Sequence, residues 1–264
     1  MREKTVPVIV LSLLTMLTLM SSIQPNALAQ KDQIYIGVSQ SYTGMNADGC
    51  MMHQLYYEMI IEDYNALGGL YVPEYGKRIN ITLVPYDDQS DIERCLIGIE
   101  YLITEAKVDL MFAPWSTEFN AAAFEVFESH TMPVVALTVG SDDAANKMKA
   151  GDITYSFITL GQPYEDAKEI VDMFTYINTT LAVGTPVGPW SDTYLRKVGI
   201  LYRSDLHGTE HSSAIGNALT AAGYEVVKIA YPTDIGIGGT FVPMITQLQE
   251  AAVDVVMCTG YWEA

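Results

Sequence analysis

The chain has 264 residues and is strongly acidic, with 32 Asp and Glu against 14 Lys and Arg and a formal net charge of −18 at pH 7. Such a charge repels phosphate backbones, which makes nucleic acid a poor candidate partner and favours a solvated surface that keeps the protein soluble. The three cysteines are too few for a disulfide scaffold, and they lack the C-x-x-C spacing of a zinc site.

The first 29 residues have the pattern of a secretory signal peptide. Arg2 and Lys4 precede an uncharged apolar run at 8–20, and a more polar stretch then ends in Ala27-Leu28-Ala29. The apolar run is shorter than the roughly 20 residues that a membrane-spanning helix needs. We therefore predict cleavage after Ala29 and an extracytoplasmic protein, in the periplasm or at the cell surface. An uncleaved membrane anchor is the alternative.

The remaining chain alternates short apolar runs with longer amphipathic ones. Strands are predicted at 34–38, 79–85, 109–113, 133–138 and 153–159, and helices at 51–67, from 90 or 91 to about 106, at 118–129 and at 165–177. After a stretch rich in Gly and Pro at 179–193, strands at 197–202, 224–231 and 253–258 alternate with helices at 209–222 and 241–252. Strands separated by helices of this length indicate βαβ units, that is, parallel sheets with helices on both faces.

Two such series predict two α/β lobes. We assign residues 30–160 to an N-terminal lobe, 161–196 to a crossover helix and inter-lobe linker, and 197–264 to a partial second lobe. The last predicted strand has no helix after it, and a bare parallel sheet edge would be poorly buried. The sequence is therefore expected to be a fragment that is truncated within its second lobe.

A binding constellation follows two neighbouring strands of the first series. Ser116 and Thr117 come after the third strand, and Thr138 and Ser141 after the fourth, each pair before a helix. Ligands of open parallel sheets bind beyond the carboxyl ends of the strands, and hydroxyls with free N–H groups at a helix N-terminus suit a carboxylate. Trp115 adds an aromatic wall. The alternatives are ordinary helix caps and a core tryptophan.

Sequence patterns that would indicate catalysis are weaker than those that indicate ligand binding. His207-Gly-Thr-Glu210-His211 fits the H-x-x-E-H pattern of a zinc hydrolase, in which the histidines bind zinc and the glutamate is the general base. Gly208 is expected to break the first helical turn and leave His207 in the preceding loop, and no third ligand is obvious. Asp87-Asp88 is better explained by capping and surface polarity. With no nucleophile arrangement either, we expect neither an enzyme nor a cofactor.

The cysteines leave two alternatives open. Cys50 and Cys95 each fall near the start of a helix that follows a neighbouring strand. Export permits a disulfide between them. Free buried thiols are the other possibility.

Six short segments, taken in their order along the chain, indicate a protein family. They are Ile34-Tyr-Ile-Gly-Val38, Thr43-Gly44, Asn65-Ala-Leu-Gly-Gly69, Tyr86-Asp-Asp-Gln-Ser-Asp91, Ala113-Pro-Trp-Ser-Thr117 and Met132-Pro-Val-Val135. Each is weak alone, but together and at these separations they resemble the type I periplasmic binding proteins, in the branch for branched-chain amino acids, amides and urea. The resemblance covers essentially all of the chain after the signal segment.

The resemblance implies a function and further site residues. It implies two lobes that close around an amino acid, amide or urea-like solute and deliver it to the membrane permease of an ABC transporter. A sensory ectodomain or amide-responsive regulator on the same fold is the alternative. The family's site would place a ligand carboxylate and ammonium at Ser116 or Thr117, with Thr138 and Ser141.

In the second lobe, the resemblance points to His207 and Tyr261. His207 stands where the family usually has an aromatic residue before glycine, and Tyr261 ends a Thr-Gly-Tyr segment that matches the family's Gly-Gly-Tyr. The histidine and the missing proline after Gly44 both argue against leucine-type ligands. His207 would make the site more polar, or make binding pH-dependent near a pKa of roughly 6.5.

Overall fold

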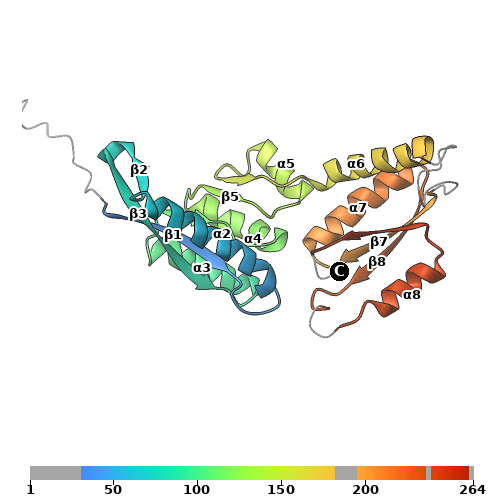
Figure 1. The fold of residues 1–264 in the computed structure, drawn as a ribbon, viewed down its shortest axis with the longest axis horizontal. Helices are drawn as coiled ribbons and strands as arrows, with labels where there is room; N and C mark the ends of the chain where they lie inside the picture. The colour runs from blue at the N-terminus through green and yellow to red at the C-terminus, as the bar shows by residue number, and fades with distance from the viewer. Residues whose placement is uncertain (1–30, 182–194, 236–238, 262–264) are drawn as a thin grey trace, which may run out of the picture.

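The computed structural model describes residues 31–181, 195–235 and 239–261. The predicted signal peptide and most of the Gly- and Pro-rich stretch lie outside these residues. Within the described ranges, no helix combines the length and the apolar character that crossing a bilayer requires. Figure 1 shows two α/β lobes joined along helix α6 (Pro163–Tyr176). We call residues 31–160 the first lobe and residues 195–261 the second lobe.

The first lobe is built on a four-stranded sheet with the order β2-β3-β1-β4. Its strands are β1 (Gln33–Gln40), β2 (Leu70–Val72), β3 (Lys77–Asp87) and β4 (Leu110–Phe112). β1 runs parallel to both β3 and β4, while β2 is an antiparallel edge strand. A separate parallel pair, β5 (Val134–Ala136) with β6 (Ser156–Ile158), continues toward α6.

The helices of the first lobe are α2 (Ala47–Ala66), α3 (Ile92–Thr104), α4 (Thr117–Ser129) and α5 (Asp142–Ala150), with a 3-10 turn at Pro73–Tyr75. α3 shows why these segments are helical. Cys95, Ile99 and Leu102 recur at helical spacing and are all fully buried against α4 and the strands. Asp91 caps the helix by accepting a hydrogen bond from the Arg94 N–H at 2.8 Å, which decides between the two predicted caps.

The second lobe has a three-stranded parallel sheet with the order β8-β7-β9. Its strands are β7 (Lys197–Arg203), β8 (Glu225–Tyr231) and β9 (Val255–Thr259), and its helices are α7 (Leu206–Ala221) and α8 (Val242–Glu250). Val198 and Ile200 of β7 pack toward α6 and α7, whereas Leu201 packs toward α8. β7 is therefore apolar on both faces, as a central parallel strand is expected to be. A short π-helical turn, Ile177–Leu181, ends α6.

The cysteines take the second of the two predicted alternatives. Cys50 and Cys95 are buried and free, and Cys258 is free and exposed. Different neighbours engage the buried pair, Ser41 for Cys50 and Ser39 for Cys95. Burial raises the pKa of Cys50 to about 12 and raises that of Cys95 as well, so both remain neutral thiols.

The adjacent carboxylates Asp87 and Asp88 have opposite environments. Asp88 is only 1% exposed, so the prediction of surface polarity is wrong for this residue. Its Oδ1 accepts hydrogen bonds from the Ser41 hydroxyl at 2.5 Å and the Ser90 N–H at 2.9 Å, yet burial raises its pKa to about 6. Asp87 is more exposed, and hydrogen bonds from Thr43 and its neighbours outweigh burial and lower its pKa.

We predict that Asp88→Asn removes a pH dependence of stability. A carboxyl whose folded pKa lies above its unfolded value stabilises the fold below pH 4, and this contribution is lost as pH rises to about 6. Between pH 4 and 7 the native chain should therefore lose about 1–3 kcal/mol relative to the variant. Urea denaturation at both pH values measures the difference. Asp87→Asn is the control: because the pKa of Asp87 is lowered, its loss should change the pH dependence of stability in the opposite direction. Equal pH profiles of stability for Asp88→Asn and the native chain would contradict the account.

Candidate ligand-binding site between the lobes

A cavity of about 560 Å³ lies between the two lobes. Its walls come mainly from the carboxyl ends of strands, as expected for an open parallel sheet, and from α6 and α7, with His53 of α2 added. The volume falls in the range of about 300–1,000 Å³ usual for small-molecule sites. The lining residues are His53, Trp115, Leu137, Thr138, Leu160, Gly161, Asp166, Glu169, Ile170, His207, His211, Ile215 and 257–261.

The hydroxyl residues predicted in the first lobe come together at the start of α4. The Ser116 N–H donates to Thr138 Oγ1 at 3.0 Å, and the Thr117 hydroxyl donates to the Thr138 carbonyl at 3.2 Å. Ser116 also caps α4, with its Oγ accepting from the Phe119 N–H at 3.4 Å. Ser116 and Thr117 are buried behind the cavity, so only Thr138 of these three residues lines it.

The second lobe presents the first turns of α7 to the cavity. Asp205 caps α7 by accepting from the Gly208 N–H at 2.8 Å. A Cβ at position 208 would lie 2.1 Å from the Arg203 carbonyl oxygen, so this glycine lets the helix start against the end of β7. The expectation that Gly208 breaks the turn and leaves His207 in a loop is therefore wrong, because α7 begins at Leu206.

His207 lies among aromatic rings. Its imidazole stacks on Tyr261 with ring centroids 5.2 Å apart, and Trp115 is 4.7 Å from the same tyrosine ring. Its Nδ1 is 3.4 Å from Thr117 Oγ1 of the first lobe. Burial, then His211 and Arg203, lower the pKa of His207 to about 4. The expected titration near 6.5 is therefore wrong for this residue, which is neutral at physiological pH.

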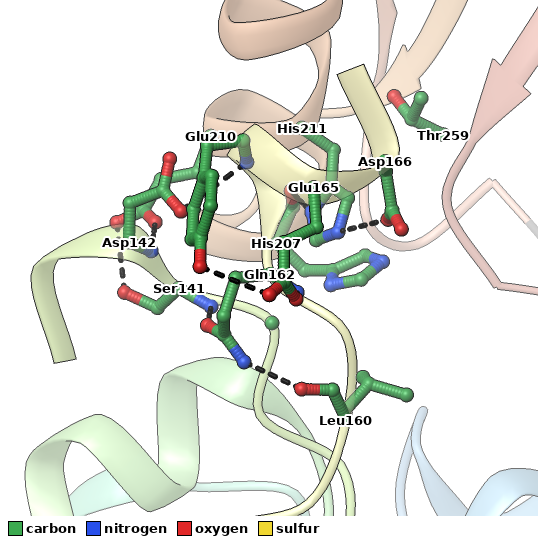
Figure 2. A network of polar contacts seen from close by, with 12 residues as sticks. Ser141, Asp142, Leu160, Gln162, Glu165, Asp166, His207, Glu210, His211 and Thr259 are labelled. Atoms are coloured by element: carbon green, nitrogen blue, oxygen red, sulfur yellow. Dashed lines mark hydrogen bonds and ion pairs between the residues drawn. The ribbon is translucent and has the colours of Figure 1, made fainter. Parts of the chain in front are cut away.

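His211 connects α7 to α6. Its Nε2 is 3.2 Å from Asp166 Oδ2, and its Nδ1 is 2.9 Å from the His207 carbonyl oxygen one turn earlier. Figure 2 shows His211 and Asp166 facing each other beside His207. Both His211 nitrogens therefore face oxygen acceptors inside the protein.

Glu210 joins the lobes at the start of α5. Its Oε1 accepts from the Ser141 hydroxyl at 3.0 Å, and its Oε2 accepts from the Asp142 N–H at 2.8 Å (Figure 2). Ser141 itself caps α5 by accepting from the Ala144 N–H at 3.2 Å. A carboxylate of the second lobe thus occupies the positive end of a first-lobe helix. The sequence did not predict this contact, because its pattern indicated Glu210 only as part of a zinc site.

The zinc hypothesis gains no support from this arrangement. His207 and His211 lie together, with ring centroids 4.0 Å apart, but Glu210 faces α5 and does not join them as the H-x-x-E-H pattern requires. Among the described residues, no group of three His, Cys, Asp or Glu side chains could hold a metal ion.

Comparison with known proteins supplies the family. The chain matches the family model "Periplasmic binding protein" over residues 33–263. Among solved structures, it is similar to the branched-chain amino acid transporter substrate-binding protein LivJ from Streptococcus pneumoniae in complex with isoleucine, with 19% identity and a TM-score of 0.65. That alignment covers 87% of this chain and 57% of LivJ.

Two further structures give the same fold. The leucine-binding protein LivK from Thermotoga maritima is 14% identical with a TM-score of 0.64, over 86% of this chain and 56% of that one. An ABC-transporter solute-binding protein from Rhodopseudomonas palustris in complex with 3,4-dihydroxybenzoic acid is 17% identical with a TM-score of 0.64, over 86% and 54%. The chain thus spans a little over half the length of these proteins.

These findings confirm the fold class and the resemblance that the six sequence segments indicated. The family and the fold are those of two-lobed solute-binding proteins, which are not enzymes. The chain belongs to the periplasmic binding protein family, and its fold is that of the two-lobed type I periplasmic binding proteins.

Proposed function

We propose that this protein is the extracytoplasmic solute-binding component of an ABC importer. It captures one small solute between its lobes and delivers it to a membrane permease. The observation that carries the proposal is the inter-lobe cavity of about 560 Å³, because both lobes contribute side chains to its lining. A solute there contacts both lobes only when they are closed, so binding shifts the molecule toward closure.

Four of the predicted site residues are proposed to touch the solute. Trp115 and Thr138 line the cavity from the first lobe, and His207 and Tyr261 line it from the second. The other three, Ser116, Thr117 and Ser141, act from behind by holding these walls and the lobe contact in position. Their hydroxyls are already hydrogen-bonded within the protein.

Polar contacts between described residues of the two lobes are proposed to hold the closed arrangement besides the solute. Glu210 binds the start of α5, Thr117 approaches His207, and the Arg203 guanidinium donates to Asn46 Oδ1 at 3.3 Å. The segment at 160–163, which leads from β6 into α6, is the proposed hinge. Closure thus depends on a few side chains at the lobe boundary, which makes it testable by single substitutions.

The test of solute binding is calorimetry of the protein with a panel that includes isoleucine, leucine and 4-hydroxybenzoate. For whichever solute binds, Tyr261→Ala should weaken affinity at least tenfold, or about 1.4 kcal/mol, because it removes a wall shared by Trp115 and His207. Tyr71→Ala is the control, since Tyr71 lies 53% exposed on the edge strand β2. Failure of every solute to bind, or undiminished affinity in Tyr261→Ala, would contradict the proposal.

We predict that Glu210→Gln weakens closure. The substitution keeps the shape of the side chain but removes the negative charge that faces the α5 N-terminus, an interaction worth about 0.3–2 kcal/mol. Solute affinity should fall by about two- to thirtyfold through faster release. Glu250→Gln, at the exposed end of α8, is the matched control. Release rates that are equal in both variants would rule out the Glu210 contact as a closing interaction.

Gly140 gives a steric test. A Cβ at this first-lobe position would lie 2.5 Å from His211 Cε1 and 3.2 Å from His207 Nδ1, both in the second lobe. Gly140→Ala should therefore leave each lobe folded but hinder closure, with at least tenfold weaker binding and a larger radius of gyration in small-angle scattering. Gly216→Ala is the control, because its Cβ would contact side chains of the second lobe alone. Unaltered binding and compaction in Gly140→Ala would refute this closed geometry.

A further inference from the structure

The charge of the cavity wall is one-sided. Asp166 and Glu169, both on α6, line the cavity, while no lysine or arginine is found among the lining residues that the structure describes. Of the three lining histidines, His53 and His207 have pKa values lowered by burial. The third, His211, is already paired with Asp166. Glu169 is exposed and interacts with Lys168 beside it on α6, but Lys168 is not part of the lining, so both carboxylates face a lining without lysine or arginine among the described residues.

Arg203 does not offset the negative charge of the cavity lining. The Arg203 guanidinium lies over the Tyr261 ring, with Cζ 4.8 Å from the ring centroid. Its Nε is 3.2 Å from Asp205 Oδ2, and both side chains of this ion pair are buried. Arg203 thus stands behind the aromatic wall with its charge matched by Asp205, which leaves little of that charge for a solute.

Side chains of the second lobe fill both positions where the sequence predicts a carboxylate site. Glu210 occupies the α5 N-terminus. At the α4 N-terminus the Tyr261 phenol lies beside Thr117, whose N–H and hydroxyl act to lower the phenol's pKa against the larger raising effect of burial. The second lobe therefore supplies partners to both helix ends.

Aromatic and aliphatic groups make up most of the remaining wall. Trp115, Tyr261 and His207 form one side, and the aliphatic lining comes from Leu137, Leu160, Ile170, Ile215 and Met257. Aromatic rings attract cations through their quadrupole, most strongly in the case of tryptophan, by about 0.5–2 kcal/mol. Such walls beside the carboxylates of α6 suit a solute that is apolar in its body and positively charged at one end.

We propose that the solute of this cavity is an organic cation with an apolar or aromatic body, such as a protonated amine or a quaternary ammonium, rather than a carboxylate. This inference rests on the proposed function and narrows its solute class. The ammonium group lies toward Asp166 and Glu169, and the body packs against the wall that Trp115, Tyr261 and His207 form together.

Matched solutes test the sign of the charge. Tyramine, tyrosine and 4-hydroxyphenylacetate share one phenolic body and are cationic, zwitterionic and anionic at pH 7; choline adds a quaternary ammonium. Calorimetry should show a cation binding at least tenfold more tightly than tyrosine and 4-hydroxyphenylacetate. Tighter binding of an anion or zwitterion would overturn the inference and leave the proposed function standing. If none of these solutes binds, and isoleucine, leucine and 4-hydroxybenzoate do not bind either, the inference and the proposed function are both contradicted.

Substitution of Asp166 and Glu169 tests whether these carboxylates cause the preference for a cation. Glu169→Gln should weaken binding of the preferred cation at least fivefold and leave binding of 4-hydroxyphenylacetate unchanged or stronger. Asp166→Asn with Glu169→Gln should weaken the cation further and reduce the dependence of its affinity on salt. Glu62→Gln, on the exposed face of α2, is the matched control, and thermal denaturation verifies folding. Unchanged cation affinity in the double variant would overturn the assignment.

Discussion

The contact between the first turns of α7 and the first lobe is the interaction on which the binding site depends. Glu210 accepts hydrogen bonds from Ser141 and from the backbone N–H of Asp142. The same stretch of helix brings His207 to Thr117 and His211 against Gly140. Because this short segment carries several of the contacts between the lobes, its position affects both the shape of the cavity and the groups that remain available to a solute.

This contact also explains the electrostatics of the cavity. Helix N-termini after parallel strands ordinarily attract anions, but here Glu210 and Tyr261 occupy the two that face the second lobe. The charges left at the solute space come from α6 and are acidic. On the proposed function, the chemistry of the site therefore depends on side chains that the second lobe contributes.

Sequence reasoning predicted what depends on local pattern. Apolar runs indicated the parallel strands, and Asp91 was one of two candidate caps for α3. It failed where a residue's surroundings come from distant segments. Asp88 is buried and accepts a hydrogen bond from Ser41, and Gly208 lies in the first turn of α7, where the absence of a Cβ lets it pack against Arg203. Ser141 and Glu210 are 69 positions apart in the sequence, so no spacing pattern could pair them.

A crystal structure of the protein grown with the tightest-binding solute tests the central claim most directly. The account predicts solute density in the cavity against the Trp115 and Tyr261 rings, contacting both lobes, with Glu210 on the α5 N-terminus. Density confined to one lobe or outside the cavity, with the lobes apart at saturating solute, would contradict it.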